Sequence, residues 1–512
     1  MGERGRNEVG VTVFFHLTTK FGSNGVSLSG VADMELLNIL GQWTLYSASQ
    51  TDYSLGAFQI GNSGGLSQLD GVGYAASSGT LGVHGLSVLQ VGGQLGLIPR
   101  SSFEDKLAIH DLNINGSFGN VAPPVNSIAN EMARLSATTS IRIDGIDYAY
   151  FANSENAGFK GYEVSNNLDL TEITARNDNQ KSHLGDVTDL LALEAYGKNF
   201  VFATSAEDAG VSSYRLDKFG RTYSKHNTGP EDGIGMSGTT AMVSVETEGD
   251  VFLIVAGSGS NSLTSFRISK QGVLREKDHI VDTGDTRFET VSALEAVQIN
   301  DRSFVLAGGN DDGITLFELT PRSGKLKLWG VLEDSNATTL ASVSDIEALE
   351  VDGELHLYVT SAHENGITHL KADVGTLASP IVGTKNAEVF DGSANDDLIL
   401  GMNGDDTLRG NAGDDWLIDG RGMDLLEGGI GADVFCFAVD RKPDTIVDFT
   451  PGVDRIDLSE IPMLYSLEQT TIVQKDFGVV VSFGSERVKI LSNDLGGDIM
   501  VADINSNDFI FN

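Results

Sequence analysis

The sequence predicts an all-β protein in which a seven-bladed β-propeller is followed by a parallel β-roll. Three observations lead to this prediction. A unit of about 52 residues recurs seven times in the larger, N-terminal part of the chain, and a unit of nine residues recurs from residue 383 onward. The composition also fits many tight turns, because 61 of the 512 residues are Gly and only 9 are Pro.

The long repeat places a turn between two apolar segments, as in NFVFATSAEDAGVSSYRL and VFLIVAGSGSNSLTSFRI. Its successive turn positions are separated by 52, 52, 52, 52, 51 and 53 residues. These positions are Ser54, Lys106, Gly158, Gly210, Ser262, Gly313 and Gly366. Each unit holds four short apolar segments joined by Gly, Asn and Asp, which is typical of a four-stranded propeller blade. Residues 1–382 are therefore expected to form a ring of seven blades, with a β-sandwich or a solenoid as the alternative.

Two segments compete for the outer strand of the seventh blade. The segment VGVTVFFHL, residues 9–17, precedes the first blade, and LASPIVG, residues 377–383, follows the last one. A strand supplied by the start of the chain would latch the ring and cover a sheet edge that is otherwise open.

The nine-residue repeat combines a column of acidic residues with a column of large apolar residues, in phase with the pattern G-G-x-G-x-D-x-U-x, where U is large and apolar. Its first six residues make a turn in which glycines allow carbonyls to point at a cation, and the Asp adds the hard anionic oxygen that calcium prefers. The last three residues make a short strand whose central side chain enters the core. The predicted calcium ligands are Asp397, Asp406, Asp415, Asp424 and Asp433, Glu388 in the imperfect first repeat, and the turn residues Gly392, Asn395, Gly401, Gly404, Gly410, Gly413, Gly422, Gly428 and Gly431.

Several positions depart from the pattern. Glu388 replaces the Asp of the first repeat, and Asp419 replaces the leading Gly of the fifth. We expect roughly three or four calcium ions, with the outermost sites weakest. Because the carboxylates repel one another without a cation, and three-residue strands bury little, calcium binding is expected to be coupled to folding.

These nonapeptides, followed by GADVFCFAVDRKPDTIVDFTPGVDRIDLS, resemble the C-terminal region of RTX (haemolysin-type repeat) proteins, in particular the serralysin-type tail. The resemblance covers about residues 383–512. It implies a β-roll over residues 383–440, in which two nonapeptides make one turn, and a β-rich cap over residues 441–512. Asp397, Asp415 and Asp433 would then line one edge, and Asp406 and Asp424 the other edge together with Glu388.

The last five residues, Asp508 to Asn512, resemble the acidic and then apolar ending of type I secretion substrates. This resemblance implies a secreted, extracellular protein that leaves the cell through a type I secretion apparatus with an uncleaved C-terminal signal. The expectation agrees with the lack of a recognisable Sec-type signal peptide and of any run of 18 apolar residues.

Charge excludes further classes of partner. The chain has 34 Lys and Arg against 72 Asp and Glu, and a net charge of −38. Nucleic acids are therefore not expected as partners, because their recognition needs a basic surface. The single cysteine, Cys436, cannot form an intrachain disulfide and is expected to be a small apolar side chain in a strand.

The innermost strands of the propeller supply a candidate channel site. Asp33, Asp189 and Asp345 occupy the same position in their blades, and His84 lies in a neighbouring column. They would hold a cation or a polar ligand, or they are strand-end residues that are simply hydrogen bonded or solvated.

The propeller offers little further evidence of catalysis. The sequence has no HExxH motif and no GxxxxGK[ST] loop. It also has no GxSxG at a strand-to-helix elbow and no dinucleotide-type GxGxxG after a strand. The blade pattern resembles lactonase-type or YVTN-type seven-bladed propellers. We expect a non-catalytic role in binding a ligand, a cell surface or a partner. A lactonase-like hydrolase with its site at the channel mouth is the alternative, and a structural protein of a surface assembly is a third.

Overall fold

The computed structural model describes residues 14–20, 28–74, 83–101, 109–122, 134–179, 181–459, 461–491 and 499–511. It divides into two compact units. The first extends to Asp373 without the segment Asn300–Arg302, and the second comprises this segment and the chain from Val374 onward. Regular structure in the described ranges consists of strands and short 3₁₀ turns, and no helix there is long and apolar enough to cross a membrane.

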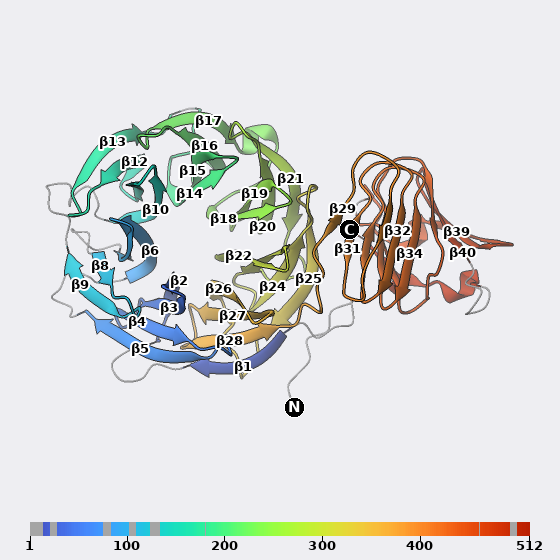
Figure 1. Cartoon of the computed structure of the whole chain (residues 1–512), viewed down its shortest axis with the longest axis horizontal. Coiled ribbons are helices and arrows are strands. Elements are labelled where there is room, and N and C mark those ends of the chain that lie inside the picture. The colour runs from blue at the N-terminus through green and yellow to red at the C-terminus, as the bar shows by residue number, and fades with distance from the viewer. Residues whose placement is uncertain are drawn as a thin grey trace. The chain divides into compact units, whose positions relative to one another are not determined.

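The first unit is a ring of seven four-stranded antiparallel sheets (Figure 1), which confirms the predicted propeller. The first three blades comprise β2 (Val31–Ile39), β3 (Gln42–Ser49), β4 (Ser54–Ile60) and β5 (Leu66–Gly73); β6 (Val83–Val91), β7 (Gln94–Ser101), β8 (Ile109–Leu112) and β9 (Phe118–Ala122); and β10 (Leu135–Ile143), β11 (Ile146–Asn153), β12 (Asn156–Val164) and β13 (Leu170–Arg176). The next two comprise β14 (Val187–Ala195), β15 (Lys198–Ser205), β16 (Gly210–Leu216) and β17 (Thr222–Thr228), and β18 (Thr239–Thr247), β19 (Asp250–Gly257), β20 (Ser262–Ile268) and β21 (Leu274–Val281). The last two comprise β22 (Ala293–Ile299), β23 (Arg302–Gly308), β24 (Gly313–Leu319) and β25 (Leu326–Glu333), and β26 (Val343–Val351), β27 (Glu354–Ser361), β28 (Ile367–Ala372) and β1 (Phe14–Lys20).

The seventh blade takes its outer strand from the start of the chain. Strand β1 pairs antiparallel with β28, from Phe14 opposite Ala372 to Lys20 opposite Ile367. The latch predicted for residues 9–17 is thus present in its part that begins at Phe14, whereas residues 9–13 lie outside the described ranges, as does the predicted turn residue Lys106. The competing segment does not join the propeller, because Ile381–Val382 forms β29 of the second unit.

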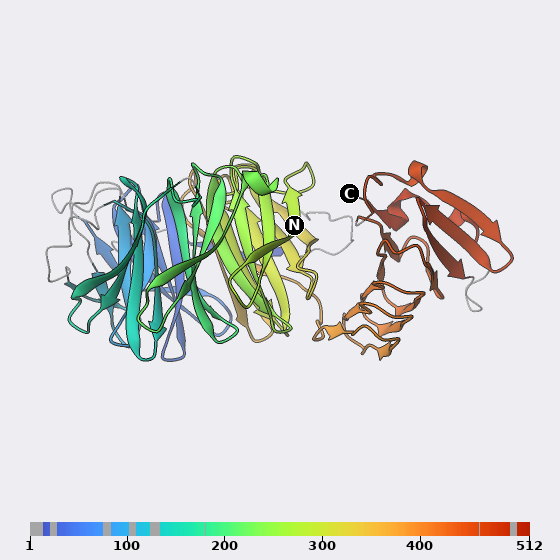
Figure 2. The same cartoon turned by 90° about the horizontal axis from the view of Figure 1, so that it is seen from above.

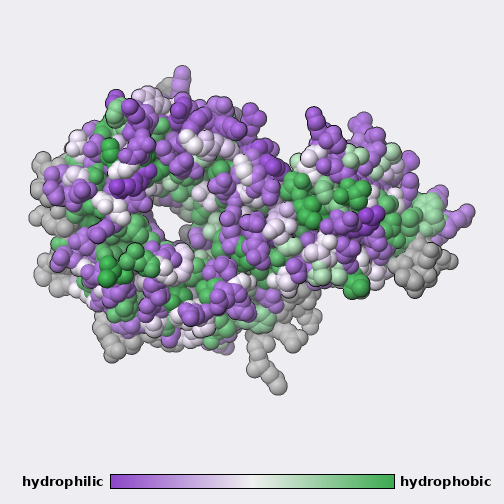
Figure 3. Space-filling view, viewed as in Figure 1, coloured by the Kyte–Doolittle hydropathy of each residue, from purple (hydrophilic) through white to green (hydrophobic). Residues whose placement is uncertain are grey.

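Neighbouring blades pack face to face through their second strands. Phe200 and Phe202 of β15 share an apolar cluster with Leu253 of β19, and Phe252, on the other face of β19, packs with Val305 of β23. Both faces of a blade are therefore covered, which explains why these strands are apolar without alternation. Figure 3 shows that the packed ring leaves an opening at its centre, toward which the first strands of the blades face.

The second unit is a coil of two sheets, and its short strands stack one above another in Figure 2. The strands pair in parallel, except for the three strands within residues 471–491, which pair antiparallel with one another at the end of one sheet. One sheet contains β29, β31 (Leu398–Leu400), β33 (Trp416–Ile418), β35 (Val434–Cys436), β37 (Arg455–Asp457) and β41 (Phe509–Ile510). The other contains β30 (Val389–Asp391), β32 (Thr407–Ala412), β34 (Leu425–Ile430), β36 (Pro443–Ile446), β40 (Glu486–Leu491), β39 (Gly478–Phe483) and β38 (Thr471–Lys475).

The register of these sheets confirms that two nonapeptides make one turn of a β-roll. Ile399 pairs with Leu417, and Leu417 with Phe435, in steps of 18 residues. All three side chains are fully buried in the core between the sheets. Strands after residue 440 extend the same two sheets and the same core. The predicted cap is therefore continuous with the roll, and a boundary at residue 440 stays a prediction.

Candidate calcium sites in the β-roll and the propeller channel

One edge of the roll carries a ladder of carboxylates. The backbone N–H of Asp397 donates to Oδ1 of Asp415 (2.8 Å), that of Asp415 to Oδ1 of Asp433 (3.0 Å), and that of Asp433 to Oδ1 of Asp454 (3.1 Å). The structure thus brings the three aspartates predicted for this edge together. It adds Asp454, which the sequence analysis missed because it follows Asp433 by 21 residues and not by 18.

The opposite edge repeats the arrangement. The backbone N–H of Glu388 donates to Oδ1 of Asp406 (2.7 Å), that of Asp406 to Oδ1 of Asp424 (2.7 Å), and that of Asp424 to Oδ1 of Asp444 (3.0 Å). Glu388 itself is only half-buried, and its Oε2 accepts a hydrogen bond from the N–H of Thr384 (2.6 Å). Asp444, at a spacing of 20 residues, was also missed.

The second carboxylate oxygen of the ladder residues has no such partner. In the part of the chain that the structure describes, Oδ2 of Asp406, Asp415, Asp424 and Asp433 is buried without a hydrogen bond. These four residues are at most 2% exposed. A buried polar atom without a partner is costly, and an anionic oxygen is the ligand type that calcium takes. The donor set therefore fits a calcium ion held beside each unpaired oxygen.

Asp397, the first residue of the ladder that ends at Asp454, differs from the others because its second carboxylate oxygen accepts hydrogen bonds. Oδ2 of Asp397 accepts from the N–H (2.6 Å) and from the Oγ (3.0 Å) of Ser393 in its own turn. Nearby, Asn395 is half-buried, and its backbone carbonyl lies under Gly413 of the next turn. The start of the roll thus satisfies its carboxylate with protein donors.

Burial shifts the titration of the ladder. Burial, and then the carboxylate of Asp397, raise the pKa of Asp415 to about 7. Burial and the neighbouring Asp454 raise the pKa of Asp433 to about 8, and burial with Asp406 raises the pKa of Asp424 to about 6. Without a cation, these turns hold their negative charges poorly near neutral pH, so protons and calcium compete for the same oxygens.

The glycines of the pattern make room for the ladder. A Cβ at Gly410 or Gly428, each at the first position of its repeat, would lie 2.0 Å or 2.2 Å from Oδ2 of the aspartate in the same turn. Gly392 and Gly401 occupy the same position, with Oδ2 of their aspartates at 2.7 Å and 3.0 Å. The fourth-position glycines have positive φ and would clash with the backbone of the turn 18 residues earlier; they are Gly404, Gly413, Gly422 and Gly431.

The departure at residue 419 adds a carboxylate to the site. Asp419, Asp424 and Asp444 are all buried, and each offers one oxygen within 4.8 Å of the others. Oδ1 of Asp419 accepts from the N–H groups of Gly420 and Ala438, and burial raises its pKa well above the ordinary value. This is the one group of three such residues that could hold a metal ion within the described ranges. Of the three, Asp419 occupies a position at which the repeat pattern predicts a glycine.

The three channel aspartates each bind the backbone of the next blade. Oδ2 of Asp345 accepts from the N–H of Met34 (2.6 Å), and Oδ2 of Asp189 from that of Met242 (2.9 Å). Oδ2 of Asp33 accepts in the same way from the N–H of Leu86 (2.7 Å). Among the described residues, these three do not form a group with oxygens at metal-binding distance. His84 lies nearby on β6, where burial, and then Arg100, lower its pKa.

A second acidic column, two residues further along the inner strands, was missed. It consists of Glu35, Glu295 and Glu347, of which the first and last follow Asp33 and Asp345 by two positions. Burial, and then the carboxylate of Asp33, raise the pKa of Glu35 to about 8. Burial and Glu35 raise the pKa of Glu295 to about 8, and burial and Glu295 raise the pKa of Glu347 well above its ordinary value. Part of this column borders a cavity of about 400 Å³ that Asp33, Arg100 and Asp189 also line.

Comparison with known families supports the resemblance seen in the tail. Residues 363–487 match the family described as Peptidase M10 serralysin C terminal. The match covers the C-terminal part of the chain only. No curated protein matches the chain.

Among solved structures, the chain is similar to the periplasmic gluconolactonase PpgL of Pseudomonas aeruginosa, with 15% identity, a TM-score of 0.45, and coverage of 61% of this chain and 88% of that one. It is similar to a Bacteroides uniformis protein whose assignment as a 6-phosphogluconolactonase is provisional, with 12% identity, a TM-score of 0.46, and coverage of 60% and 87%. A third is the Dos1 propeller, with 10% identity, a TM-score of 0.39, and coverage of 64% and 75%.

Proposed function

We propose that this chain is a secreted calcium-binding protein of the RTX type, whose β-roll folds when it binds calcium outside the cell and whose propeller binds a ligand, a surface or a partner. One observation carries the calcium part of the proposal. Among the residues that the structure describes, no donor satisfies four buried aspartate oxygens in the stacked turns.

Calcium would replace the repulsion between the carboxylates of the turns by attraction to a shared cation. Each edge stacks carboxylates at one per coil turn, and mutual repulsion adds to the cost of burial. A divalent cation between two turns compensates charge on both, so the free energy of binding becomes free energy of folding. Low calcium inside the cell would leave the tail loose enough for export, and higher calcium outside would order it.

The test is a calcium titration of the full chain, with and without EGTA, followed by circular dichroism and by limited proteolysis with mapping of the cleavage sites. We expect cleavage within residues 383–512 in EGTA and protection in calcium, while the propeller resists cleavage in both. Unchanged cleavage and unchanged spectra on adding calcium would contradict the proposal.

A substitution separates a ligand role from a structural one. Asp415→Asn keeps the Oδ1 acceptor for the N–H of Asp397 and removes the charge of the unpaired oxygen. We expect this variant to weaken calcium binding by tenfold or more, yet to be as stable as the parent, or more stable, in EGTA. The matched control is Asp476→Asn, an exposed carboxylate in the turn between β38 and β39, which should leave both measurements unchanged.

Export is tested separately. A chain that ends before residue 499 should remain inside cells that carry a type I secretion apparatus, while the full chain appears in the medium. The binding role of the propeller is supported by the channel aspartates, whose carboxylates are engaged between blades and do not converge on one point. A lactonase-like hydrolase stays the alternative, and measurable hydrolysis of lactones by the purified chain would favour it.

A further inference from the structure

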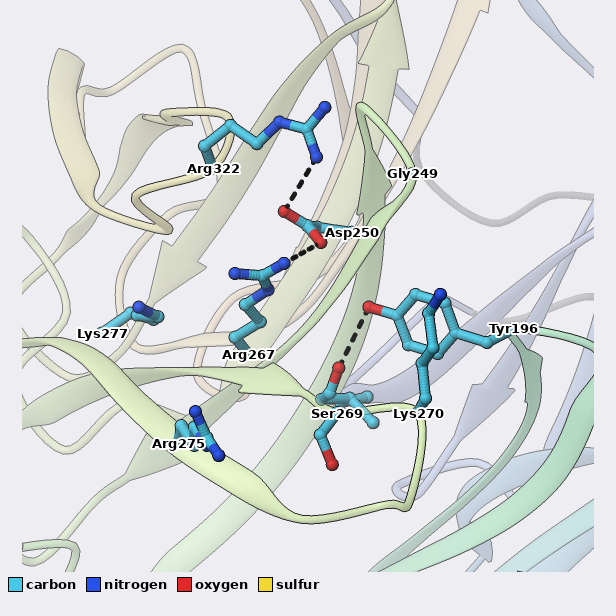
Figure 4. A pocket seen from close by; sticks show the side chains of 10 residues that line it. Tyr196, Gly249, Asp250, Arg267, Ser269, Lys270, Arg275, Lys277 and Arg322 are labelled. Carbon is cyan, nitrogen blue, oxygen red and sulfur yellow. Dashed lines mark hydrogen bonds and ion pairs between the residues drawn. The ribbon is translucent and has the colours of Figure 1, made fainter. Parts of the chain in front are cut away.

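The propeller contains a basic pocket outside its central channel. The pocket has a volume of about 460 Å³ and lies where the strand-connecting turns of the fourth, fifth and sixth blades meet (Figure 4). Its charged lining consists of Arg267, Lys270, Arg275, Lys277 and Arg322 around the single carboxylate of Asp250. Five cations around one anion are unexpected in a chain with a net charge of −38.

Asp250 fixes two of these cations. Its side chain is buried, with Oδ1 bound to Nη2 of Arg267 and Oδ2 at 3.4 Å from Nη1 of Arg322. The side chains of Arg267 and Arg322 remain 41% and 39% exposed. Figure 4 shows them on either side of Asp250, so each guanidinium is oriented by one contact and keeps further N–H donors free for a ligand.

The other three cations, Lys270, Arg275 and Lys277, differ from these two arginines. In the described part of the chain, no ion pair forms at Lys270, Arg275 or Lys277. The ammonium group of Lys270 lies 5.9 Å from the ring centre of Tyr196, opposite Arg275 and Lys277 in Figure 4. The Tyr196 hydroxyl is already used, because it donates to the carbonyl of Ile268 and accepts from the N–H of Val251. The pocket therefore combines a rigid wall with an excess of positive charge.

We propose that this pocket binds a small ligand that carries two or more sulfate, phosphate or carboxylate groups. A guanidinium presents paired donors that match an oxyanion, and charge-assisted hydrogen bonds of this kind are about twice as strong as neutral ones. The volume lies within the range of ordinary small-molecule sites, about 300–1,000 Å³. The inference rests on the proposed binding role of the propeller, and it adds the place and the chemical class of the ligand.

The fourth blade supplies an internal control. Arg215 pairs with Phe200 as Arg267 pairs with Phe252, and Lys225 lies at the same strand irregularity as Lys277 one blade later. However, the residue that opens β15 is Lys198, whereas Asp250 opens β19. The fourth blade thus has two equivalent cations, Arg215 and Lys225, but it lacks a carboxylate at the position of Asp250 that would orient the arginine.

The experiment is isothermal titration calorimetry of the full chain with three probes, in saturating calcium and at low ionic strength. Sucrose octasulfate, fructose 1,6-bisphosphate and trigalacturonate present sulfate, phosphate and carboxylate groups, and sucrose is the uncharged control. We expect at least one charged probe to bind, and the strongest of the three identifies the source of the anion. The double variant Arg275→Gln/Lys277→Gln should lower that affinity tenfold or more, whereas Arg215→Gln/Lys225→Gln, with the same loss of charge, should change it less than twofold.

The proposal is overturned if no charged probe binds, if both double variants lose affinity equally, or if neither does. In the last case a bound probe would still support a binding role for the propeller and would only exclude this pocket. The calcium proposal is judged by a different measurement, the response of the tail to EGTA, so the two failures are distinguishable.

Discussion

The carboxylate of Asp33 in the first blade and the guanidinium of Arg100 in the second meet at 2.9 Å. The same Oδ2 atom of Asp33 accepts from the backbone N–H of Leu86 at 2.7 Å, and Arg100 also donates to the carbonyl of Ser136 in the third blade. Two side chains thus connect three blades at the wall of the channel. The equivalent aspartates of the fourth and seventh blades each make one such connection.

Substitution of this aspartate should loosen the ring. Asp33→Ala leaves the N–H of Leu86 without its acceptor and the Arg100 guanidinium without its carboxylate, and we expect a loss of about 1–3 kcal/mol in the free energy of unfolding. Asp33→Asn keeps an acceptor and should lose less. Urea unfolding monitored at the propeller transition measures both. Equal stability of Asp33→Ala and the parent would show that the connection does not stabilise the ring.

The channel glutamates predict a dependence of stability on pH. The pKa of Glu35 is raised from its ordinary 4.5 to about 8, so the folded chain binds a proton that the unfolded chain has lost between these values. The contribution of Glu35 to stability is then fully present below about pH 4.5 and is lost as the pH rises to about 8. Glu35→Gln should remove this dependence, so its advantage over the parent should grow with pH in unfolding experiments at saturating calcium.

An exposed glutamate provides the control for that series. Glu163 on β12 is exposed, and Glu163→Gln should give a pH profile parallel to that of the parent. If Glu35→Gln also gives a parallel profile, Glu35 does not retain its proton in the folded chain.

Asp419 should contribute to one calcium site in particular. Asp419→Gly restores the residue of the repeat pattern and removes one of three clustered carboxylates. We expect weaker binding at one site, by about tenfold, with the remaining sites unchanged in calorimetry. In EGTA the variant should be as stable as the parent or more stable, because a buried carboxyl with a raised pKa is lost. Loss of stability in EGTA would instead indicate that Asp419 acts through its hydrogen bonds to Gly420 and Ala438.

Two glycines separate backbone strain from steric clash. Gly413 has φ +116°, and a Cβ there would lie 2.5 Å from the carbonyl oxygen of Asn395 in the turn below. Gly452 has φ +75° with no atom within 4 Å. Gly452→Ala should therefore cost about 1–2 kcal/mol for the left-handed conformation alone. Gly413→Ala should cost clearly more and shift the calcium midpoint of folding upward, as seen by circular dichroism.

The sequence was sufficient to predict the two repeats and hence the architecture, because each repeat encodes its own geometry. Ile399, Leu417 and Phe435 stack since nine-residue units fix the register without any distant contact. The same argument failed at Asp444 and Asp454, where the coil continues but short insertions change the spacing to 20 and 21 residues. A search for aspartates beyond the strict period would have found them.

In the propeller, sequence reasoning placed Asp33, Asp189 and Asp345 on inner strands, and the structure shows what they bind. Whether such residues converge depends on the radius of the ring and on which backbone N–H lies nearest, and neither follows from a repeat. The column of Glu35, Glu295 and Glu347 could have been predicted from the sequence, because it lies two residues further along the inner strands and faces the same side. The basic pocket could not have been predicted, since Asp250, Arg267 and Arg322 come from different hairpins.

The pairing of β1 with β28 has a consequence for how the chain is made and handled. Phe14–Lys20 is synthesised before the strand that it covers, which ends at Ala372, so the ring stays open until the last blade has been translated. Closure joins segments that are very far apart in the chain, which makes it an intrinsically slow step. Removal of the first twenty residues would expose the edge of β28, which could then pair with a strand of a second molecule. Strand β1 therefore protects the propeller against aggregation, although it is remote in sequence from most of the strands that it stabilises.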